Sequence, residues 1–361
     1  MFAFIASILA SIFSALMLIY DRLMITDCYD RKPDHAWFVS SFMGTVLGFV
    51  VTIPILLVLY FFYEIPVLSL LVEVFYPHGL WMLLSGVLSV LALRHYFRVF
   101  IPENEDDAIN ETAISMWLAS LPIFVLFSLV FINYFHLNIG IFSNLDHAEI
   151  SWPFIIATIV ATIGLIGFEG VGKDGSKPMK WTYYKEIGMA LFLFVVYSLI
   201  IYAVAKDITT IDSTILSFIF LPFYWLGWAF GTLLWFKRDF RNEFKISWPR
   251  IRHFAVPILI AEIIGMLVYF FSFVSLNNLD PTLVNLIFSA HILLVFVLNY
   301  LLRLLYADLV SKKETSWTLF GFKMSIDSLP QNGTSHLSSE LFFLIVALIG
   351  IMIATNMVVF D

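Results

Sequence analysis

The chain has 361 residues, of which 61% are hydrophobic and 13% are charged, and its formal net charge is −7. A soluble domain carries about 25% charged residues, so this composition excludes an ordinary soluble domain and indicates a polytopic membrane protein. The acidic balance and the lack of a long basic run argue against a nucleic-acid partner. Cys28 is the single cysteine of the sequence, so no disulfide can form within the chain.

Apolar runs long enough to cross a bilayer recur along the chain, and each crossing needs about 20 residues. We predict ten transmembrane helices, over residues 3–21, 37–62, 79–100, 112–135, 151–169, 186–205, 213–236, 254–274, 281–304 and 339–359. A further apolar piece at 66–75 is too short to span; it is predicted to lie at the interface or to extend the third helix. The expected fold is therefore an all-α membrane bundle of ten helices.

Lysine and arginine residues gather on one side of this predicted bundle. Nineteen of the 20 lie at or beyond the ends of odd-numbered helices, and one follows an even-numbered helix. By the positive-inside rule, the odd-numbered loops are predicted to be cytoplasmic and both termini to lie outside. The expected location is the plasma membrane, with multiple passes.

The same charges predict two halves of opposite orientation. Helices 1–5 and 6–10 form two sets, and an odd number of crossings inverts the second set relative to the first. Corresponding loops of the two sets have opposite charge bias, as inversion requires. We predict a first repeat at residues 1–172, a cytoplasmic linker at 173–184 and a second repeat at 185–361. Inverted repeats of this kind recur in secondary transporters.

One segment carries a family resemblance. Residues 269–292 read YFFSFVSLNNLDPTLVNLIFSAHI. They resemble the eighth helix, short turn and ninth helix of the drug/metabolite transporter superfamily in its ten-helix, EamA-like form. That family often has a Glu-Pro pair midway along helices 4 and 9, where this chain has Leu121-Pro122 and His291-Ile292. The resemblance implies a ten-helix transporter, although family members usually have cytoplasmic termini, the reverse of the orientation predicted here.

Two ionisable residues lie inside adjacent apolar runs. Glu262 is predicted near the middle of its helix, where a carboxylate costs several kcal/mol and is expected to face an interior pathway. It would carry a proton or bind a substrate amine; the alternative is a protonated carboxyl group hydrogen-bonded to a neighbouring helix. His291 is expected at about the same depth in the next helix, where it could pair with Glu262 or serve only in packing.

Other side chains are candidates for the same pathway. Tyr224 and Trp228 could line a cavity and stack on an organic substrate, or they could face lipid. Arg94 and His95 close the third helix, where they would reach the headgroups or form a cationic entrance for an anionic substrate. Pro122 and Pro257 are predicted to kink their helices, which would let one half rock against the other.

These features predict a secondary transporter that moves a small organic metabolite or amphipathic compound by alternating access. Membrane lipids are expected partners, and proton coupling through Glu262 is a further hypothesis. The alternative is a multispan membrane enzyme or assembly factor acting on lipid-linked substrates, with Asp21, Arg22, Arg94 and His95 as its polar groups. No phosphate-binding loop and no metal-ligand spacing occurs, so neither a cofactor nor a metal is predicted, and enzyme activity is not expected.

Overall fold

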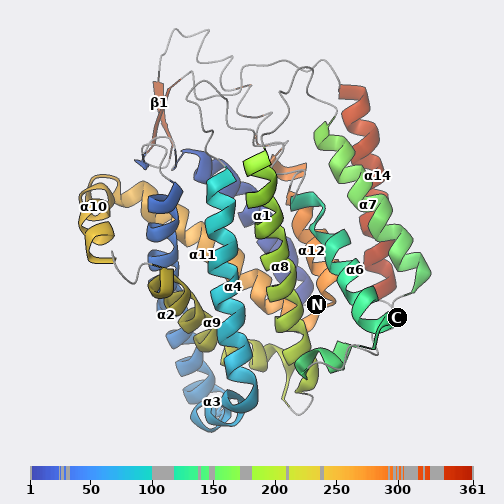
Figure 1. Cartoon of the computed structure of the whole chain (residues 1–361), viewed down its shortest axis with the longest axis horizontal. Coiled ribbons are helices and arrows are strands. Elements are labelled where there is room, and N and C mark those ends of the chain that lie inside the picture. The colour runs from blue at the N-terminus through green and yellow to red at the C-terminus, as the bar shows by residue number, and fades with distance from the viewer. Residues whose placement is uncertain are drawn as a thin grey trace.

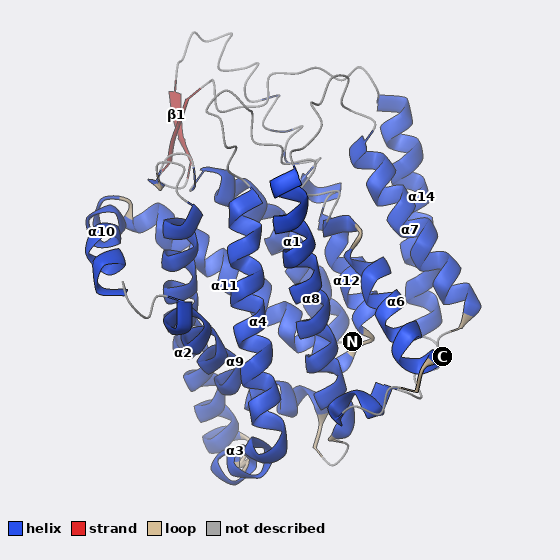
Figure 2. Ribbon diagram, in the orientation of Figure 1, coloured by secondary structure: helices blue, strands red, loops and turns tan. Residues whose placement is uncertain are grey.

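The computed structural model of the chain describes residues 2–23, 25, 28–29, 33–99, 118–136, 140–145, 151–170, 181–208, 211–235, 240–291, 293–295, 298, 301, 304, 316–319, 322–325 and 337–359. Helices make up nearly all of this part of the chain (Figure 2), so the all-α class is confirmed for the bundle. A small antiparallel hairpin, β1 (Ser316–Leu319) with β2 (Phe322–Ser325), lies outside it.

Each of the ten predicted ranges overlaps a helix. These helices are α1 (Phe2–Leu23), α2 (Pro33–Phe62), α4 (Leu80–Val99), α6 (Leu121–Tyr134), α7 (Trp152–Gly170), α8 (Trp181–Asp207), α9 (Ser213–Trp235), α11 (Ala255–Asn278), α12 (Pro281–Ser289) and α14 (Leu337–Val359). Within the described residues, five are long and apolar enough to cross a membrane: α2, α4, α8, α9 and α11. The others are apolar but shorter over the residues described. Several apolar helices of this kind are consistent with an integral membrane protein.

The apolar piece before the third helix does not extend that helix. It forms the separate α3 (Val67–Val74), followed by a π-helical turn, η2 (Phe75–Gly79). The backbone leaves helical geometry at Tyr76, with φ −118° and ψ 111°, so α3 and α4 have different directions. α3 lies at the lower end of the bundle in Figure 1, and its Leu68 and Val72 side chains are exposed. Such an exposed apolar face suits the membrane interface better than water.

A second short helix occupies a segment that the sequence presents as a basic loop. α10 (Phe240–His253) connects α9 to α11, contacts α2 and α11, and lies at one side of the bundle in Figure 1. A single 3-10 turn, η3 (Gly140–Leu145), lies between α6 and α7. α8 begins at Trp181, within the range expected for the linker, and residues 171–180 lie outside the described part of the chain.

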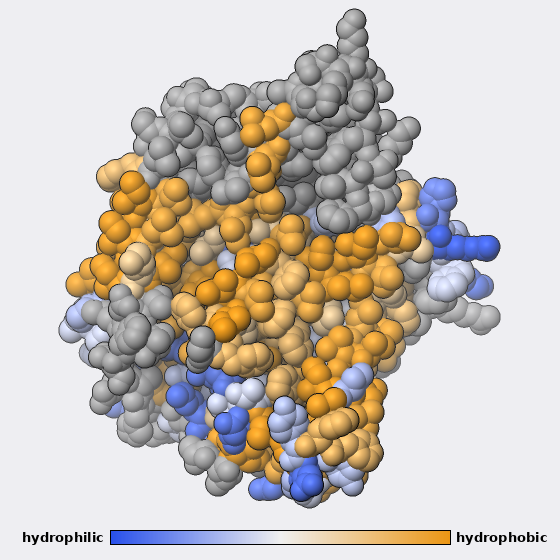
Figure 3. All heavy atoms as spheres, turned by 180° about the vertical axis from the view of Figure 1, so that it is seen from behind, coloured by the Kyte–Doolittle hydropathy of each residue, from blue (hydrophilic) through white to orange (hydrophobic). Residues whose placement is uncertain are grey.

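Large apolar side chains cover the outside of the bundle. Figure 3 shows a broad hydrophobic surface on the face seen from behind, with hydrophilic residues at its lower margin and along one edge. Over the whole bundle, the exposed large apolar side chains come from helices of both sets of five. Examples are Val50, Ile53, Phe127, Ile156, Phe192, Leu234 and Phe342. Exposed apolar area on this scale is a liability in water but is expected where lipid is the solvent.

Helix packing follows one pattern in the two sets of five. α4 packs along α8 as α1 packs along α11, and α4 contacts α9 as α11 contacts α2. Likewise α2 contacts α4 as α9 contacts α11, and α6 contacts α8 as α12 contacts α1. Exchanging each helix with the one five positions away maps these contacts onto one another. The match is incomplete, because α8 also contacts α11 whereas α1 and α4 touch less.

The contact between α7 and α14 has the same symmetry at the level of residues. A Cβ added at Gly164 would lie 2.5 Å from the backbone nitrogen of Ala347, and a Cβ added at Gly350 would lie 2.5 Å from that of Ala161. The sequences that meet are Ala161-Thr-Ile-Gly164 and Ala347-Leu-Ile-Gly350. Small residues at these positions let the two backbones approach closely.

Replacing Gly164 by valine is therefore expected to destabilise the protein by about 1–3 kcal/mol, because the new side chain overlaps the backbone of α14. The free energy of unfolding in detergent measures this effect. Gly188→Val on α8 is the control, since a Cβ at Gly188 meets nothing within 4 Å. Equal losses in the two variants would contradict the close approach of α7 and α14.

The two prolines expected to kink their helices lie in the first turns of α6 and α11. Each of these helices follows a one-residue break, at Ser120 before α6 and at Phe254 before α11, and helical residues precede each break. The first turn tolerates proline because its N–H groups have no partner within the helix. The kinks expected at Pro122 and Pro257 stay predictions. Internal prolines are Pro54, Pro222 and Pro249.

Candidate functional site: two adjoining cavities

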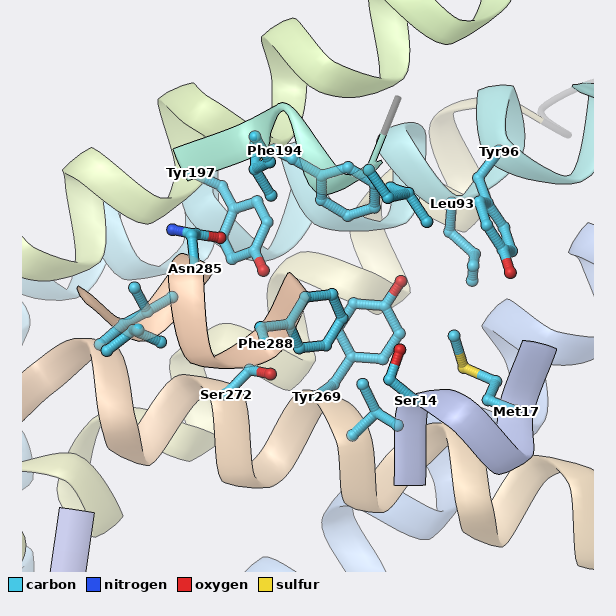
Figure 4. A pocket seen from close by; sticks show the side chains of 15 residues that line it. Ser14, Met17, Leu93, Tyr96, Phe194, Tyr197, Tyr269, Ser272, Asn285 and Phe288 are labelled. Atoms are coloured by element: carbon cyan, nitrogen blue, oxygen red, sulfur yellow. The ribbon is translucent and has the colours of Figure 1, made fainter. Parts of the chain in front are cut away.

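Two adjoining cavities lie where helices of both sets meet, and Figure 4 shows the larger of these two. Its lining comes from α1, α4, α6, α8, α11 and α12, together with Leu118. Aromatic rings dominate it: Tyr96, Phe194, Tyr197, Tyr269 and Phe288. In Figure 4, Phe194 and Tyr197 lie across the space from Tyr269 and Ser272. Ser14, Ser272 and Asn285 add a few polar groups to this mainly apolar wall.

α12 brings Asn285 and Phe288 to this cavity, and its start is fixed by the sequence. Oδ1 of Asp280 accepts hydrogen bonds from the backbone N–H groups of Thr282 at 2.8 Å and Leu283 at 3.2 Å. Pro281 follows as the first helical residue, where its fixed φ favours a helix start. The Asp-Pro pair thus positions one wall of the cavity.

The smaller cavity adjoins the first and contains acidic groups. Met17, Leu93 and Tyr269 line both. The smaller one is also lined by Asp21 of α1, Ser40 of α2, Trp228 of α9 and Glu262 of α11. The volume open to water is about 40 Å³ in the larger cavity and about 20 Å³ in the smaller one. One water molecule needs roughly 10–15 Å³. This conformation therefore holds a few waters at most, and an organic ligand requires the helices to separate.

Glu262 is buried, with 5% of its surface exposed, and its Oε1 accepts a hydrogen bond from the Ser40 hydroxyl at 2.5 Å. The carboxyl group of Glu262 thus has one feature of each expected alternative: it lines a cavity, and it is hydrogen-bonded to a neighbouring helix. Glu262 is the eighth of the 24 residues of α11.

His291 does not meet Glu262. Its Nδ1 is 2.7 Å from the carbonyl oxygen of Phe288, its Nε2 has no hydrogen-bond partner among the described residues, and it lines neither cavity. The expected equal depth fails because α11 continues to Asn278. Glu262 lies 16 residues, or about 24 Å, before the end of α11, whereas His291 lies two residues beyond the end of α12 at Ser289. The predicted pair is therefore corrected to two separate groups.

Tyr224 and Trp228 are buried between helices, which excludes the lipid-facing alternative. Both bind Ser89 of α4: the Trp228 Nε1 donates to its hydroxyl at 2.5 Å, and the Tyr224 hydroxyl lies 2.9 Å from it. Trp228 lines the smaller cavity and packs edge-on against Tyr269 at 4.7 Å, whereas Tyr224 lines neither cavity. Of the two predicted aromatic residues, only Trp228 can touch a ligand directly.

The polar end of α4 forms an ion-pair cluster with α2 and α8, and the charged residues of this cluster line neither cavity. Arg98 binds Asp34 of α2 through two contacts of 3.1 Å, and its Nη1 lies 3.6 Å from Oε1 of Glu186 on α8. His95 pairs with the same Glu186. Arg94 is buried, with its guanidinium 5.8 Å from the Trp37 ring centre and its Nε 3.5 Å from Oδ1 of Asp34.

Arg94 and His95 thus have carboxylate partners in this structure. Neither residue lines either of the two cavities, and Arg94 is buried. The spacing along α4 explains the division: Leu93, Tyr96 and Phe97 face the cavities, and the residues between them face α2 and α8. Glu186, which as a sequence feature marks only the start of a span, is a partner in this cluster.

The Asp34–Arg98 pair is expected to contribute about 0.5–1 kcal/mol at low salt, because Asp34 is 52% exposed and water screens the pair. A double-mutant cycle with Asp34→Asn and Arg98→Gln, followed by chemical unfolding, measures this coupling free energy. It should shrink at high ionic strength. A coupling that is zero at low salt, or that does not respond to salt, would contradict the pairing.

Comparisons with known proteins give a fold and no function. No family model matches the chain, and no curated protein matches it. A solved structure described as "Crystal structure of protein" is similar over 98% of this chain and 98% of its own, at 13% identity and a TM-score of 0.52. At this identity the likeness concerns the fold alone, and it extends over the whole helical arrangement.

Proposed function

We propose that this chain is a secondary transporter that carries a small organic or amphipathic compound across the membrane by alternating access. The observation that carries the proposal is the pair of adjoining cavities, whose walls come from helices of both sets of five. Transporters built from inverted repeats bind their substrates at the interface of the repeats, near the middle of the membrane. A mainly aromatic cavity with a few polar groups is the usual form of a site for a small organic molecule.

Two inverted five-helix repeats are part of this proposal. The corresponding helix contacts in the two sets support it, as does the reciprocal Ala-x-x-Gly contact of α7 with α14. In that contact Gly164 meets Ala347 while Ala161 meets Gly350, so residue numbers rise on one helix as they fall on the other. That antiparallel relation is required of equivalent helices in inverted halves. The opposite charge bias of corresponding loops supports the same arrangement, with ten crossings and both termini outside.

The ion-pair cluster suggests how one end of the pathway closes. It joins α2 and α4 of the first set to α8 of the second, beside the cavity-lining residues Leu93, Tyr96 and Phe97. Partly exposed ion pairs contribute only about 0–1 kcal/mol each, so the helices can separate here without a large penalty. In our proposal, opening at this cytoplasmic end breaks the cluster and admits solvent to the cavities.

The family that fits this plan is the drug/metabolite transporter superfamily in its ten-helix, EamA-like form. The segment 269–292 is the basis of that assignment. The enzyme alternative relies on Asp21, Arg94 and His95 as its polar groups. In the structure, Arg94 and His95 pair with carboxylates in the cluster, whereas Asp21 lines the smaller cavity. No described feature favours the enzyme over the transporter.

Transport can be tested in liposomes. We expect purified protein to take up one or more components of an isotope-labelled metabolite extract when a pH gradient is applied. In the Glu262→Gln variant, pH-driven uptake of those components should fall at least tenfold, or about 1.4 kcal/mol, because the group assigned to the proton is gone. Glu73→Gln, on the exposed surface of α3, is the matched control. The absence of uptake of any component, with protein shown to be folded, would overturn the proposal.

A further inference from the structure

A second carboxylate faces the same small cavity as Glu262. Asp21, near the end of α1, is 7% exposed and lines this cavity. The two carboxyl groups are close enough to interact electrostatically. Oδ2 of Asp21 has no hydrogen-bond partner among the described residues. A buried carboxylate oxygen that faces a cavity without a partner indicates that a donor or a cation completes the site.

No positively charged side chain of the described residues lines the cavity that holds this pair. Neither cavity is lined by a lysine, arginine or histidine among the residues that the structure describes. Arg94, Arg98 and His95 lie on the same helix as cavity-lining residues but contact Asp34 and Glu186. Two buried carboxylates of like charge are unstable without a compensating cation or protons.

A further polar group near the pair also lacks a partner. Tyr29 is 2% exposed, and its hydroxyl has no hydrogen bond within the described part of the chain. It interacts electrostatically with both Asp21 and Glu262. Tyr29 does not line the cavity itself, but its hydroxyl is a second buried polar group without a hydrogen bond close to the two carboxyl groups.

The shapes of the two cavities restrict that ligand. The smaller one has space for about 20 Å³ of water, so a compact charged group such as a primary ammonium fits beside the carboxyl groups with less movement of the helices than a bulky quaternary one. Trp228 and Tyr269 line it, and aromatic faces attract a desolvated cation. The adjoining larger cavity, with Phe194, Tyr197 and Phe288, offers room of aromatic character for an apolar body once the helices separate.

We infer that the transported compound is an amphipathic primary amine. Its ammonium group lies between Asp21, Glu262 and the Ser40 hydroxyl, and its apolar part occupies the aromatic cavity. The role as cargo rests on the proposed transport function, whereas binding of the amine does not depend on it. A divalent metal fits poorly, because Ca²⁺ takes 6–8 oxygen ligands and Mg²⁺ an octahedral set. The described residues contain no group of three or more aspartate, glutamate, histidine or cysteine side chains suited to a metal.

Calorimetric titration of the full-length protein in detergent tests this inference. The probes are 2-phenylethylamine, the neutral 2-phenylethanol of matched shape, and the trimethylammonium analogue of the amine. We expect saturable binding of the amine, and affinity at least about tenfold weaker for each of the other two, equivalent to about 1.4 kcal/mol. Sodium chloride at the same concentration tests whether an inorganic monovalent cation occupies the site instead.

Asp21→Asn and Glu262→Gln should each weaken amine binding at least about tenfold, since one of two compensating charges is lost. Glu73→Gln on the surface of α3 should leave it unchanged. Equal affinity for amine and alcohol in the unmodified protein would overturn the inference even if the variants fail to fold, and so would displacement of the amine by sodium. Uptake of an anionic or neutral compound without amine binding would overturn this inference and leave the transport proposal intact. Amine binding without any transport would overturn the transport proposal and leave the amine site intact.

Discussion

Replacing Gly86 by alanine is expected to lower the unfolding midpoint of the detergent-solubilised protein by more than about 5 °C, the result of overpacking worth about 2–3 kcal/mol. A Cβ at this position would lie 2.1 Å from the carbonyl oxygen of Tyr224 and 3.0 Å from Cα of Gly227. Both contacts are with the backbone of α9, so no side chain can rotate away. Relief requires α4 and α9 to move apart, which also disturbs the cavity walls carried by these helices.

The control is Gly188→Ala on α8, where a Cβ meets nothing within 4 Å. Alanine is about 1 kcal/mol more favourable than glycine inside a helix, so this variant should be as stable as the unmodified protein or more so. Gly227→Ala provides a second test from the other helix, because its Cβ would lie 2.1 Å from the carbonyl oxygen of Leu83. If Gly86→Ala and Gly188→Ala melt alike, α4 and α9 do not cross at this separation.

Ser89→Ala is the second substitution with a large expected effect. The Ser89 hydroxyl joins the Trp228 indole N–H at 2.5 Å and the Tyr224 hydroxyl at 2.9 Å, and all three side chains are buried. Its removal leaves two buried polar groups without a partner, each worth about 1–3 kcal/mol. We expect a loss of about 2–4 kcal/mol in the free energy of unfolding, together with a change in Trp228 fluorescence.

Ser85→Ala is the matched control for that experiment. Ser85 is also buried on α4, about one turn earlier, but its hydroxyl donates to the carbonyl of Met82 in its own helix at 2.7 Å. The loss of this local bond strands no second side chain, so an effect below about 1 kcal/mol is expected. A loss for Ser89→Ala no larger than for Ser85→Ala would show that the hydroxyl does not link α4 to α9.

The helices were predictable because long apolar runs leave the chain little alternative in lipid, where the backbone must satisfy its own hydrogen bonds. α10 was not, since Phe240–His253 is rich in charge and contains Pro249, both features typical of a loop. The β1–β2 hairpin lies in a segment whose sequence also reads as a long loop. α10 packs against α2 and α11, so tertiary contacts outweigh its local sequence pattern.

A site residue could be predicted where its own position in the sequence is unusual, and it could not be predicted where its role depends on contacts with other helices. Glu262 stands out as a charge within an apolar run, and it does line a cavity. The position of Asp21 at a cavity was not predicted, because sequence cannot distinguish a terminal carboxylate in water from one turned inward. Ser40 carries no signal at all, and its role depends on α2 lying beside α11. Of the two alternatives for His291, the pair with Glu262 assumed that α11 ends near residue 274, whereas this helix continues to Asn278.

The claim on which the function depends is that the two five-helix sets enter the membrane in opposite orientations. α3 follows the second helix of the first set, and α10 follows the second helix of the second set. If the sets are inverted, α3 and α10 lie on opposite sides of the membrane. Single cysteines at Glu73→Cys and Lys245→Cys, both exposed positions, can be labelled in a Cys28→Ala background. In intact cells, a membrane-impermeant thiol reagent should modify the cysteine at position 73 and leave that at 245 unmodified until the membrane is opened. Labelling of both from the same side would contradict inverted repeats and the transport mechanism built on them.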